Sequence, residues 1–420
     1  MLRSRTTMMA SNPKRVPIPK NGVDYRGKIV LAPMVRSGEL PSRLLALKYG
    51  ADLVWGPETV DKSMIGTTKA LNPITSTIDF TRPPSNPSRS QPPARKESLI
   101  YRLHPTREHQ KLIFQIGTAS PTTAVEAAKL VAENVAGIDV NAGCPKPFST
   151  TGGMGAALLQ DPDRLASILT ALVKEIGEVY EIGISVKIRL LETAEKTEAL
   201  VRKLCSTGIT GLTIHCRTTP MRPRERAIRD QLRMIADVCR EAGVACLMNG
   251  DVKNREEALQ LVQQYGVDGA MIATAAEANP SCFRTGEEGG LLPWREVVTE
   301  YMKIALEVDN KWGNTKFLLN QIMPGKSEAF RRVIGCRGYR QVCEVLELHH
   351  LLDLAEEVDE RLGIDENKKT TAMKKVKHQN ESAQAAGGHM SSQRSLGADK
   401  RNPLSERGVG VGRTLHAMAI

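Results

Sequence analysis

The sequence lacks several features that would assign the chain to a class directly. None of its apolar runs reaches 18 residues, which excludes a transmembrane helix and argues against a membrane partner. Its eight cysteines form no CxxC pair, and no hydrophobic secretory segment begins the chain. We therefore expect free thiols in a reducing compartment, not a disulfide framework or a zinc ribbon. HExxH and clustered His or Asp at ligand spacing are also missing, so we expect no metal.

Acidic residues are missing from the first 20 residues, and this absence helps to locate the positive charge. That segment holds five Lys or Arg, and residues 364–420 hold ten against five Asp or Glu. Of the net charge of +11, residues 21–363 therefore carry only about +1. Basic tails attract nucleic acid or anionic membrane without specificity, but such tails also serve as solubilising or targeting extensions. The composition leaves both interpretations open.

Apolar runs of strand length alternate with helical patterns from residue 28 onward. The helical patterns start after cap residues such as Ser120, Asp161 and Asn254 and end near glycines, which is typical of α-helices. They cover Pro41–Tyr49, Pro121–Val135, Pro162–Ile176, Ala194–Ser206, Ile228–Ala242 and Arg255–Tyr265. The predicted strands are Ile29–Met34, Ala51–Trp55, Leu112–Gly117, Gly137–Gly143, Ile184–Leu190, Gly211–Arg217, Cys246–Asp251 and Gly269–Thr274. Eight alternating units favour an α/β fold with a closed (β/α)₈ TIM barrel over a doubly wound open sheet.

The rest of the chain has a different composition. Residues 1–22 are predicted to be an irregular basic segment, and the barrel to span 23–284. A Pro- and Ser-rich insertion at about 72–107 is predicted to be a surface loop between the second and third barrel strands. Residues 293–363 contain only helical patterns, at Val297–Asp309, Thr315–Met323, Ser327–Ile334 and Tyr339–Leu362, and predict a small helical domain. Residues 364–420 have the composition of a disordered basic tail.

The segment around Cys144 carries the clearest chemical signal. Cys144 follows the predicted strand Gly137–Gly143 and precedes the glycine-rich run 151–157. This position is the carboxyl end of a barrel strand, where barrel enzymes perform their chemistry. A thiol with an ordinary pKa of about 8.5 can donate a proton to carbon, or attack as a thiolate if its pKa is depressed. A buried structural cysteine is the alternative, because free cysteine often behaves as a small hydrophobe.

Polar residues end most of the other predicted strands, which places them around the same mouth. Lys187 is suited to hold negative charge on a flavin ring, and Gln115 and His215 to hydrogen-bond the ring edges. Gly250 allows a phosphate to approach backbone N–H groups closely, and the last two strand ends are the usual phosphate site of a barrel. These residue types predict a phosphorylated planar cofactor such as FMN.

The chain resembles the tRNA-dihydrouridine synthase family over about residues 25–350. The NxGCPxxxxxxGGxGA segment at 141–156 is its most specific match. The chain is most similar to the eukaryotic dihydrouridine synthase 2 branch, in a fungal-type form with no double-stranded-RNA-binding domain after the helices. The matching segments are LAPMVRSGELPSRLLALKYGAD, FQIGTA, GIDVNAGCPKPFSTTGGMGAALL, VKIRL, IHCR, MNGDV and NTKFLLNQI.

This resemblance implies an FMN-dependent enzyme that reduces a uridine in the D-loop of tRNA, at position 20, to 5,6-dihydrouridine. NADPH is the implied reductant. Hydride is delivered to C6 of a flipped-out uracil, and Cys144 then protonates C5 as general acid. Residues 152–155 are expected to act as a closing lid, and an ordinary turn is the alternative.

The resemblance also implies roles for individual residues. Cys144 is the expected catalytic residue. The expected FMN contacts are Pro33, Met34, Val35, Gln115, Lys187, His215, Asn249, Gly250, Asp251, Ala273 and Thr274. The expected tRNA contacts are Asn141, Lys146, Arg189, Arg217, Arg222, Arg224, Asn314 and Lys316. The last five of these belong to two basic clusters, after the sixth strand and in the helical domain, which we expect to lie on either side of the tRNA.

Two positions depart from the family pattern. Thr274 stands where the family usually has Arg, which would grip the FMN phosphate in bidentate fashion, and Cys216 stands where Gly is common. Two other functions therefore stay open: a flavin-dependent barrel oxidoreductase acting on a free pyrimidine, and a non-enzymatic tRNA-binding paralogue without flavin. We further expect a monomer located in the cytoplasm. The lysine pairs of the tail leave two interpretations open, a signal for nuclear import and an inert extension.

Overall fold

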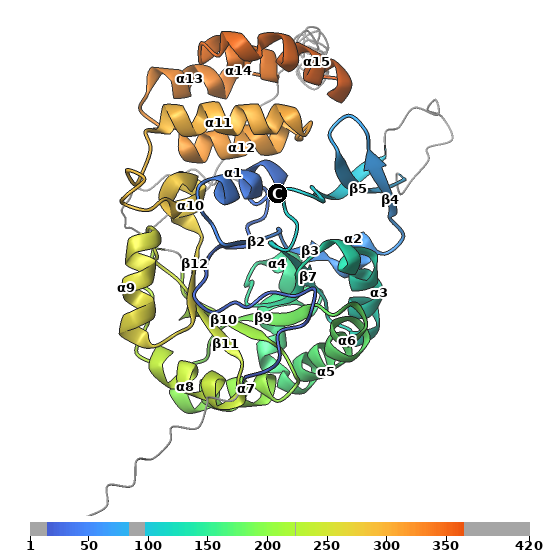
Figure 1. Ribbon diagram of the computed structural model, residues 1–420, viewed down its shortest axis with the longest axis vertical. Helices are drawn as coiled ribbons and strands as arrows, with labels where there is room; N and C mark the ends of the chain where they lie inside the picture. The colour runs from blue at the N-terminus through green and yellow to red at the C-terminus, as the bar shows by residue number, and fades with distance from the viewer. Residues whose placement is uncertain (1–14, 84–96, 223, 365–420) are drawn as a thin grey trace, which may run out of the picture. The chain divides into compact units, whose positions relative to one another are not determined.

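The computed structural model describes residues 15–83, 97–222 and 224–364, and its centre is a closed barrel of eight parallel strands (Figure 1). Strand β2 pairs with both β1 and β7, and this second pairing closes the ring, which confirms the predicted (β/α)₈ architecture. The barrel strands are β1 Ile29–Leu31, β2 Leu53–Trp55, β7 Leu112–Gly117, β8 Gly137–Ala142, β9 Gly183–Leu190, β10 Gly211–Thr218, β11 Ala245–Asn249 and β12 Gly269–Ile272. The short strand β3 (Thr59–Val60) continues the line of β2 and also pairs with β7.

Helices surround the barrel, and the sequence signals at their ends explain where most of them begin. Asp161, Thr193 and Asn254 each accept a hydrogen bond from a backbone N–H of the first turn, which satisfies a donor that the helix itself leaves open. The main helices of this layer are α1 Leu40–Lys48, α3 Pro121–Val131, α5 Pro162–Leu172, α7 Ala194–Cys205, α8 Leu232–Ala242 and α9 Arg255–Tyr265. Shorter turns are α2 Asp61–Met64, η1 Ala132–Asn134, α4 Pro147–Thr150, η2 Gly155–Gln160, the π-helical η3 Val173–Gly177, α6 Glu178–Tyr180, α10 Thr274–Ala278 and η4 Pro280–Phe283.

Helix α8 begins four residues later than the periodicity predicts. Ile228 donates its backbone N–H to the carbonyl of Cys216 at 2.7 Å. The Arg229 guanidinium donates to the carbonyls of Gly250 and Asp251. These bonds hold residues 228–231 against the ends of β10 and β11, so the backbone there cannot enter the helix.

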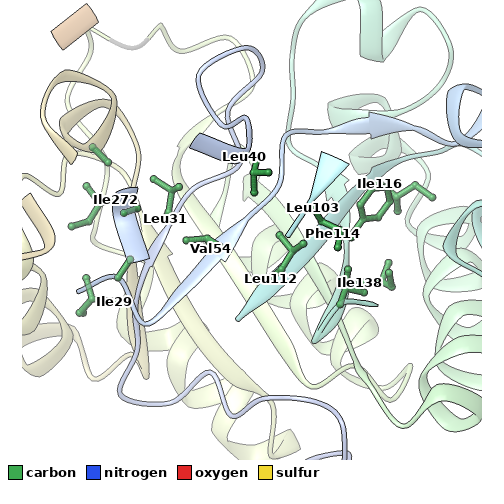
Figure 2. Close-up of a cluster of buried hydrophobic side chains, with 14 of the residues drawn as sticks. Ile29, Leu31, Leu40, Val54, Leu103, Leu112, Phe114, Ile116, Ile138 and Ile272 are labelled. Carbon is green, nitrogen blue, oxygen red and sulfur yellow. The ribbon is translucent and has the colours of Figure 1, made fainter. Parts of the chain in front are cut away.

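Apolar side chains from strands and helices form one core between the barrel and its helical layer (Figure 2). Ile29, Leu31, Val54, Leu112 and Ile138 are all less than 3% exposed. Side chains alternate along a strand, so one set faces the helices and the other faces the barrel interior. The second set forms a smaller cluster around Tyr25, Trp55, Val30, Leu247 and Met271.

Tyr25 fills the amino-terminal end of the barrel interior. Its ring lies 5.8 Å from that of Trp55. A Cβ on Gly211 would lie 2.7 Å from the Tyr25 ring, and one on Gly137 would lie 2.9 Å from its hydroxyl. Glycine at these two strand starts therefore makes room for the tyrosine. This end of the barrel is sealed by packing, so an opening to solvent is left to the other end.

The predicted surface loop at about 72–107 is wrong where the described residues form strands. The structure has an antiparallel sheet there, formed by β4 Thr68–Asn72, β5 Thr77–Arg82 and β6 Ser98–Leu103. The prolines that suggested a loop gather between β5 and β6, in residues 83–93. The alternating pattern of Thr77–Arg82, typical of a half-buried strand, was overlooked beside them. Residues 84–96 lie outside the described part of the chain, as do 1–14 and 365–420.

The C-terminal part is helical, as predicted, with one difference. Helices α11 Trp294–Glu307, α12 Trp312–Ile322 and α13 Glu328–Gly335 match the predicted elements, but the predicted helix Tyr339–Leu362 is wrong as a single element. It is divided into α14 Tyr339–Val345, η5 His349–Leu351 and α15 Leu352–Leu362. Leu348 donates its N–H to the carbonyl of Cys343, and Glu347 between the helices has φ of +60°. Buried Leu346 and Leu348 continue the apolar pattern across this break and hide it in the sequence. No helix among the described residues has the length and apolarity needed to cross a membrane.

Candidate active site

A cavity of about 450 Å³ opens at the carboxyl ends of the barrel strands. This volume lies in the range of small-molecule and cofactor sites. Residues that follow or end β1, β7, β8, β9, β10, β11 and β12 meet in its wall, although they lie far apart in the sequence. The predicted residues that line it are Pro33, Met34, Val35, Gln115, Asn141, Cys144, Lys146, Lys187, Arg189, His215, Asn249, Ala273 and Thr274.

Cys144 is held in the wall of this cavity by its neighbours in sequence. The side-chain oxygen of Asn141 accepts hydrogen bonds from the backbone N–H groups of Gly143 and Cys144, both at 3.0 Å. The Cys144 carbonyl accepts a bond from Ala156, which ties the loop to η2. A Cβ on Gly155 would lie 2.6 Å from that carbonyl, so glycine is required at this turn. The other seven cysteines are buried, whereas Cys144 is only half-buried.

The surroundings of Cys144 favour the thiol over the thiolate. Burial raises its pKa, and the nearby Glu58 carboxyl acts in the same direction, against the opposing effects of the Lys146 backbone N–H and of the Lys146 and Arg189 cations. A thiol whose pKa lies above its ordinary value of about 8.5 is protonated at neutral pH. Of the two chemistries open to this cysteine, the geometry therefore favours proton donation over nucleophilic attack.

Lys187 gives the cavity a fixed positive group. Its Nζ donates to the side-chain oxygen of Asn249 at 2.9 Å, and the Asn249 amide in turn donates to the Met271 carbonyl at 2.9 Å. Burial, together with the neighbouring Arg189 cation, lowers the pKa of Lys187 to about 8. At pH 7 the ammonium still predominates, so it can hold an anionic ring atom of a ligand.

Below the cavity lies a buried acid that the sequence analysis did not single out. Asp139 accepts hydrogen bonds from Gln115 at 2.8 Å and from Ser185 at 2.7 Å. Burial raises its pKa to about 6, against the stabilising effect of these donors and of Lys187. The signal available in the sequence was an aspartate inside an otherwise apolar strand, which needs partners to be buried there. Its oxygens orient the Gln115 amide in the cavity wall.

A smaller cavity of about 160 Å³ adjoins the main one and shares Arg189, His215 and Thr274 with it. Arg217, Gly250 and Asp251, which were also predicted as site residues, line this second cavity. Gly250 has φ of +126°, and a Cβ there would meet Ala227 at 3.2 Å. Glycine is therefore required at this position, and it leaves the backbone open to a ligand.

His215 is a neutral donor beside the two cavities. Burial and the Lys187, Arg189 and Arg217 cations lower its pKa far below the ordinary value. An Arg217 N–H lies 3.2 Å from Nε2 of His215. Because a guanidinium can only donate, Nε2 accepts and Nδ1 carries the proton. Arg217 itself is 5% exposed and also pairs with Asp251 at 2.5 Å.

The residues of both cavities fit a phosphorylated flavin. The walls carry the cations Lys187, Arg189 and Arg217, the amides Gln115 and Asn249, and a glycine that leaves its backbone open. Cations and amide donors suit the oxygen and nitrogen edge of an isoalloxazine ring and a phosphate. No group of three or more metal-ligating side chains occurs among the residues that the structure covers.

Four of the predicted tRNA contacts lie outside these cavities. Arg222 and Arg224 are exposed on the loop after β10. Asn314 and Lys316 are half-buried on α12, where Lys316 donates to the Cys336 carbonyl at 2.8 Å. Contact of any of these four with RNA stays a prediction.

Several wall residues were missed because nothing local marks them. Glu58, Ser37 and Glu277 supply polar groups, and Phe148 and Phe317 supply rings at the cavity. Phe317 comes from α12, and the Arg36 guanidinium lies 4.5 Å from the centre of its ring. Phe148 is 50% exposed. Aromatic residues make up only 4% of the chain, so two rings at one cavity indicate a surface that can stack on a planar group.

Comparison with known proteins identifies a family and several relatives. The family model described as Dihydrouridine synthase (Dus) matches residues 30–350. The chain is 52% identical to the tRNA-dihydrouridine(20) synthase [NAD(P)+] of Schizosaccharomyces pombe, over 80% of this chain and 66% of that protein. It is 45% identical to the Saccharomyces cerevisiae protein of the same name, over 77% of this chain and 84% of that protein.

Among solved structures, DHODH from Eimeria tenella in complex with ferulenol matches with a TM-score of 0.39 and 17% identity, over 59% of this chain and 76% of that one. The family match covers the barrel strands from the second residue of β1 onward and extends into the C-terminal helices. The chain therefore belongs to the dihydrouridine synthase (Dus) family.

Proposed function

We propose that this protein reduces a uridine of tRNA, at position 20 of the D-loop, to 5,6-dihydrouridine, with FMN as its flavin and NADPH as reductant. The observation that carries the proposal is the position of Cys144 in the wall of a cofactor-sized cavity that Lys187 and Arg189 also line. Membership of the Dus family and the names of the two fungal relatives support the same reaction and position.

The residues that would hold the flavin come from six strand ends. Lys187, Gln115 and Asn249 would face the ring, and Pro33, Met34 and Val35 would contact it from the loop after β1. The smaller cavity would take the phosphate, with the Gly250 backbone, His215, Asp251, Ala273 and Thr274 around it. Arg189 and Arg217 also line this cavity and supply cations where Thr274 cannot, which supports FMN over a flavin without phosphate. When bound, the flavin supplies the hydride that reduces C6 of the pyrimidine.

Cys144 would supply the proton for C5. A thiol held by Asn141 and kept protonated by its surroundings can transfer a proton to a carbon centre that has gained electrons. Arg189 donates to the Gly143 carbonyl at 2.6 Å and so fixes the same loop from the other side. Asn141 and Arg189 would also lie beside the uracil.

The substrate base has to leave the stacked tRNA to reach this cavity, at a cost of a few kcal/mol. The exposed Phe148 ring and the Phe317 ring offer stacking surfaces at the cavity that would offset part of this cost. Lys146, which is exposed beside them, would contact the RNA backbone.

The test begins with the absorbance of the purified protein between 350 and 500 nm, where a bound flavin gives a yellow protein. Wild type supplied with NADPH and unmodified tRNA should form dihydrouridine. Cys144→Ala should keep the flavin and lose dihydrouridine formation by about 10² to 10⁴-fold.

Each other outcome has a defined meaning. A colourless protein that binds tRNA but takes up no FMN would replace the enzyme with a flavin-free tRNA-binding paralogue. Reduction of free uracil or orotate without activity on tRNA would select a barrel reductase for small pyrimidines. Full activity of Cys144→Ala would remove Cys144 as the acid.

A further inference from the structure

Glu58 lies in the cavity wall next to the Cys144 loop, and the proposed reaction gives it no role so far. It follows β2, in the gap before β3, and lines the same cavity as Asn141 and Cys144. Ser149, on α4, donates its hydroxyl to Oε1 of Glu58 at 3.1 Å and is fully buried. A Cβ on Gly117 would lie 2.5 Å from the same oxygen, so glycine at the end of β7 leaves the space that this carboxyl occupies.

The groups around Glu58 face it from several elements. Ser149 hydrogen-bonds its carboxyl, Asn141 and Cys144 line the same cavity, and Lys146 is the nearby cation. Arg189 and Lys187 on β9 complete the charged groups around Cys144 itself. Burial is the largest effect on Glu58 and raises its pKa, so its protonated form extends to higher pH than that of an exposed glutamate.

Each turnover leaves a thiolate that has to be protonated again. Transfer of the Cys144 proton to C5 leaves a negative sulfur in a half-buried site, which the same burial disfavours. Of the two carboxyl groups that line the cavity, Glu58 and Glu277, Glu58 is the one whose charge acts on the Cys144 sulfur.

We propose that Glu58 returns a proton to the Cys144 thiolate after each reduction, and so links the thiol to bulk solvent. This inference rests on the proposed function. The Glu58 carboxyl loses its O–H proton, Cys144 gains an S–H bond, and the carboxylate then takes a proton from water at the cavity mouth. No electrons move in this step. One solvent proton therefore reaches C5 in each cycle and balances the hydride delivered to C6.

The experiment separates the first turnover from later ones. Wild type, Glu58→Gln and a control, Glu39→Gln, are loaded with FMN, reduced with NADPH and mixed with tRNA. Glu39 is the matched control because burial also raises its pKa, while it lies outside both cavities. In Glu58→Gln the first dihydrouridine per enzyme should form within about 2-fold of the wild-type rate, because Cys144 starts protonated. Steady-state turnover should then fall by about 10²-fold.

A second readout needs no flavin chemistry. Cys144 is the only cysteine that is not buried, so iodoacetamide should alkylate it first. The Glu58 carboxyl contributes to the raised pKa of Cys144. Glu58→Gln removes the ionised form of this carboxyl, so it should lower that pKa and speed alkylation at pH 8, whereas Glu39→Gln should leave the rate unchanged.

The outcomes separate this inference from the proposed function. Steady-state turnover of Glu58→Gln at the wild-type rate overturns the proton return. An equal loss in the first and later turnovers, with an unchanged alkylation profile, overturns it in favour of a purely structural role. If wild type forms no dihydrouridine at all, the proposed function itself fails.

Discussion

Asp139 is a carboxylic acid with no solvent exposure inside the barrel, and burial raises its pKa from 3.8 to about 6. Between these values the folded protein binds a proton that the unfolded chain has released. The free energy of unfolding therefore decreases as pH rises from about 4 to 6, by about 3 kcal/mol in total. The hydrogen bonds from Gln115 and Ser185 stabilise the carboxylate and so limit how far burial raises the pKa of Asp139.

We expect Asp139→Asn to remove this part of the pH dependence. Asparagine keeps the size of the side chain and cannot titrate. The decrease of about 3 kcal/mol in the free energy of unfolding between pH 4 and 6 should therefore be absent in the variant. Urea unfolding at pH 4, 5 and 6 measures the slope. An unchanged slope in the variant would assign the effect to other groups.

At the scale of elements, the ion pair of Arg43 and Glu108 joins α1 to the segment that enters β7. Both side chains are buried, with Nε of Arg43 2.6 Å from Glu108. Arg43 also donates to the carbonyls of Gly38 and Arg102, so it connects the loop after β1 to the antiparallel sheet. This sheet is held further by Arg102, which pairs with Asp79 and reaches the carbonyl of Asp309 after α11.

Glu108→Gln should destabilise the fold by about 3–5 kcal/mol, because it leaves the Arg43 guanidinium buried without its anion. The exposed pair Glu192–Lys196 provides the control, and Glu192→Gln should leave the stability nearly unchanged, because solvent screens the pair. Urea midpoints at pH 7 compare the two. Equal effects would mean that the buried pair contributes no more than a surface pair.

At the scale of the whole molecule, exposed cations gather on and beside α13, although the chain between the two tails is nearly neutral. Residues 21–363 have a net charge of only about +1, but Lys326, Arg331, Arg332 and Arg337 are exposed on or beside α13. The helices also contact the barrel loops, through Arg36 on Phe317 and Arg107 on Glu307. An extended substrate could thus contact α13 while one base enters the cavity. The predicted separate helical domain, the monomeric state and the cytoplasmic and nuclear location stay predictions.

The charge reversal Arg331→Glu with Arg332→Glu should weaken tRNA binding and reduce its salt dependence. Loss of two phosphate contacts should lower the slope of log affinity against log salt by about 1.5 to 2. Binding measured between 50 and 200 mM salt gives the slope. The same charge reversal at Lys174 and Lys196, which are exposed on the outer layer of the barrel, should leave this slope nearly unchanged. Equal effects of the two double variants would mean that only the net charge of the protein matters.

Local sequence was enough to predict most of the barrel. Apolar runs, cap residues and terminal glycines are local signals, and eight alternating units leave few alternatives to a closed sheet. They also bring the strand ends together, which placed Cys144, Lys187 and His215 at one mouth before any contact was known. The antiparallel strands around Phe80 and Tyr101 were missed, because the neighbouring prolines dominated the composition of that segment.

The sequence by itself determined the order of strands and helices, the family, and the residues that sit directly on strand ends. Only the tertiary structure decided which distant groups meet them. Glu58 faces Cys144 across 86 positions of chain, and Phe317 reaches the cavity from a helix beyond the barrel. Such contacts depend on how the chain closes in space, and the burial that closure produces sets the pKa of Cys144, Asp139 and Lys187.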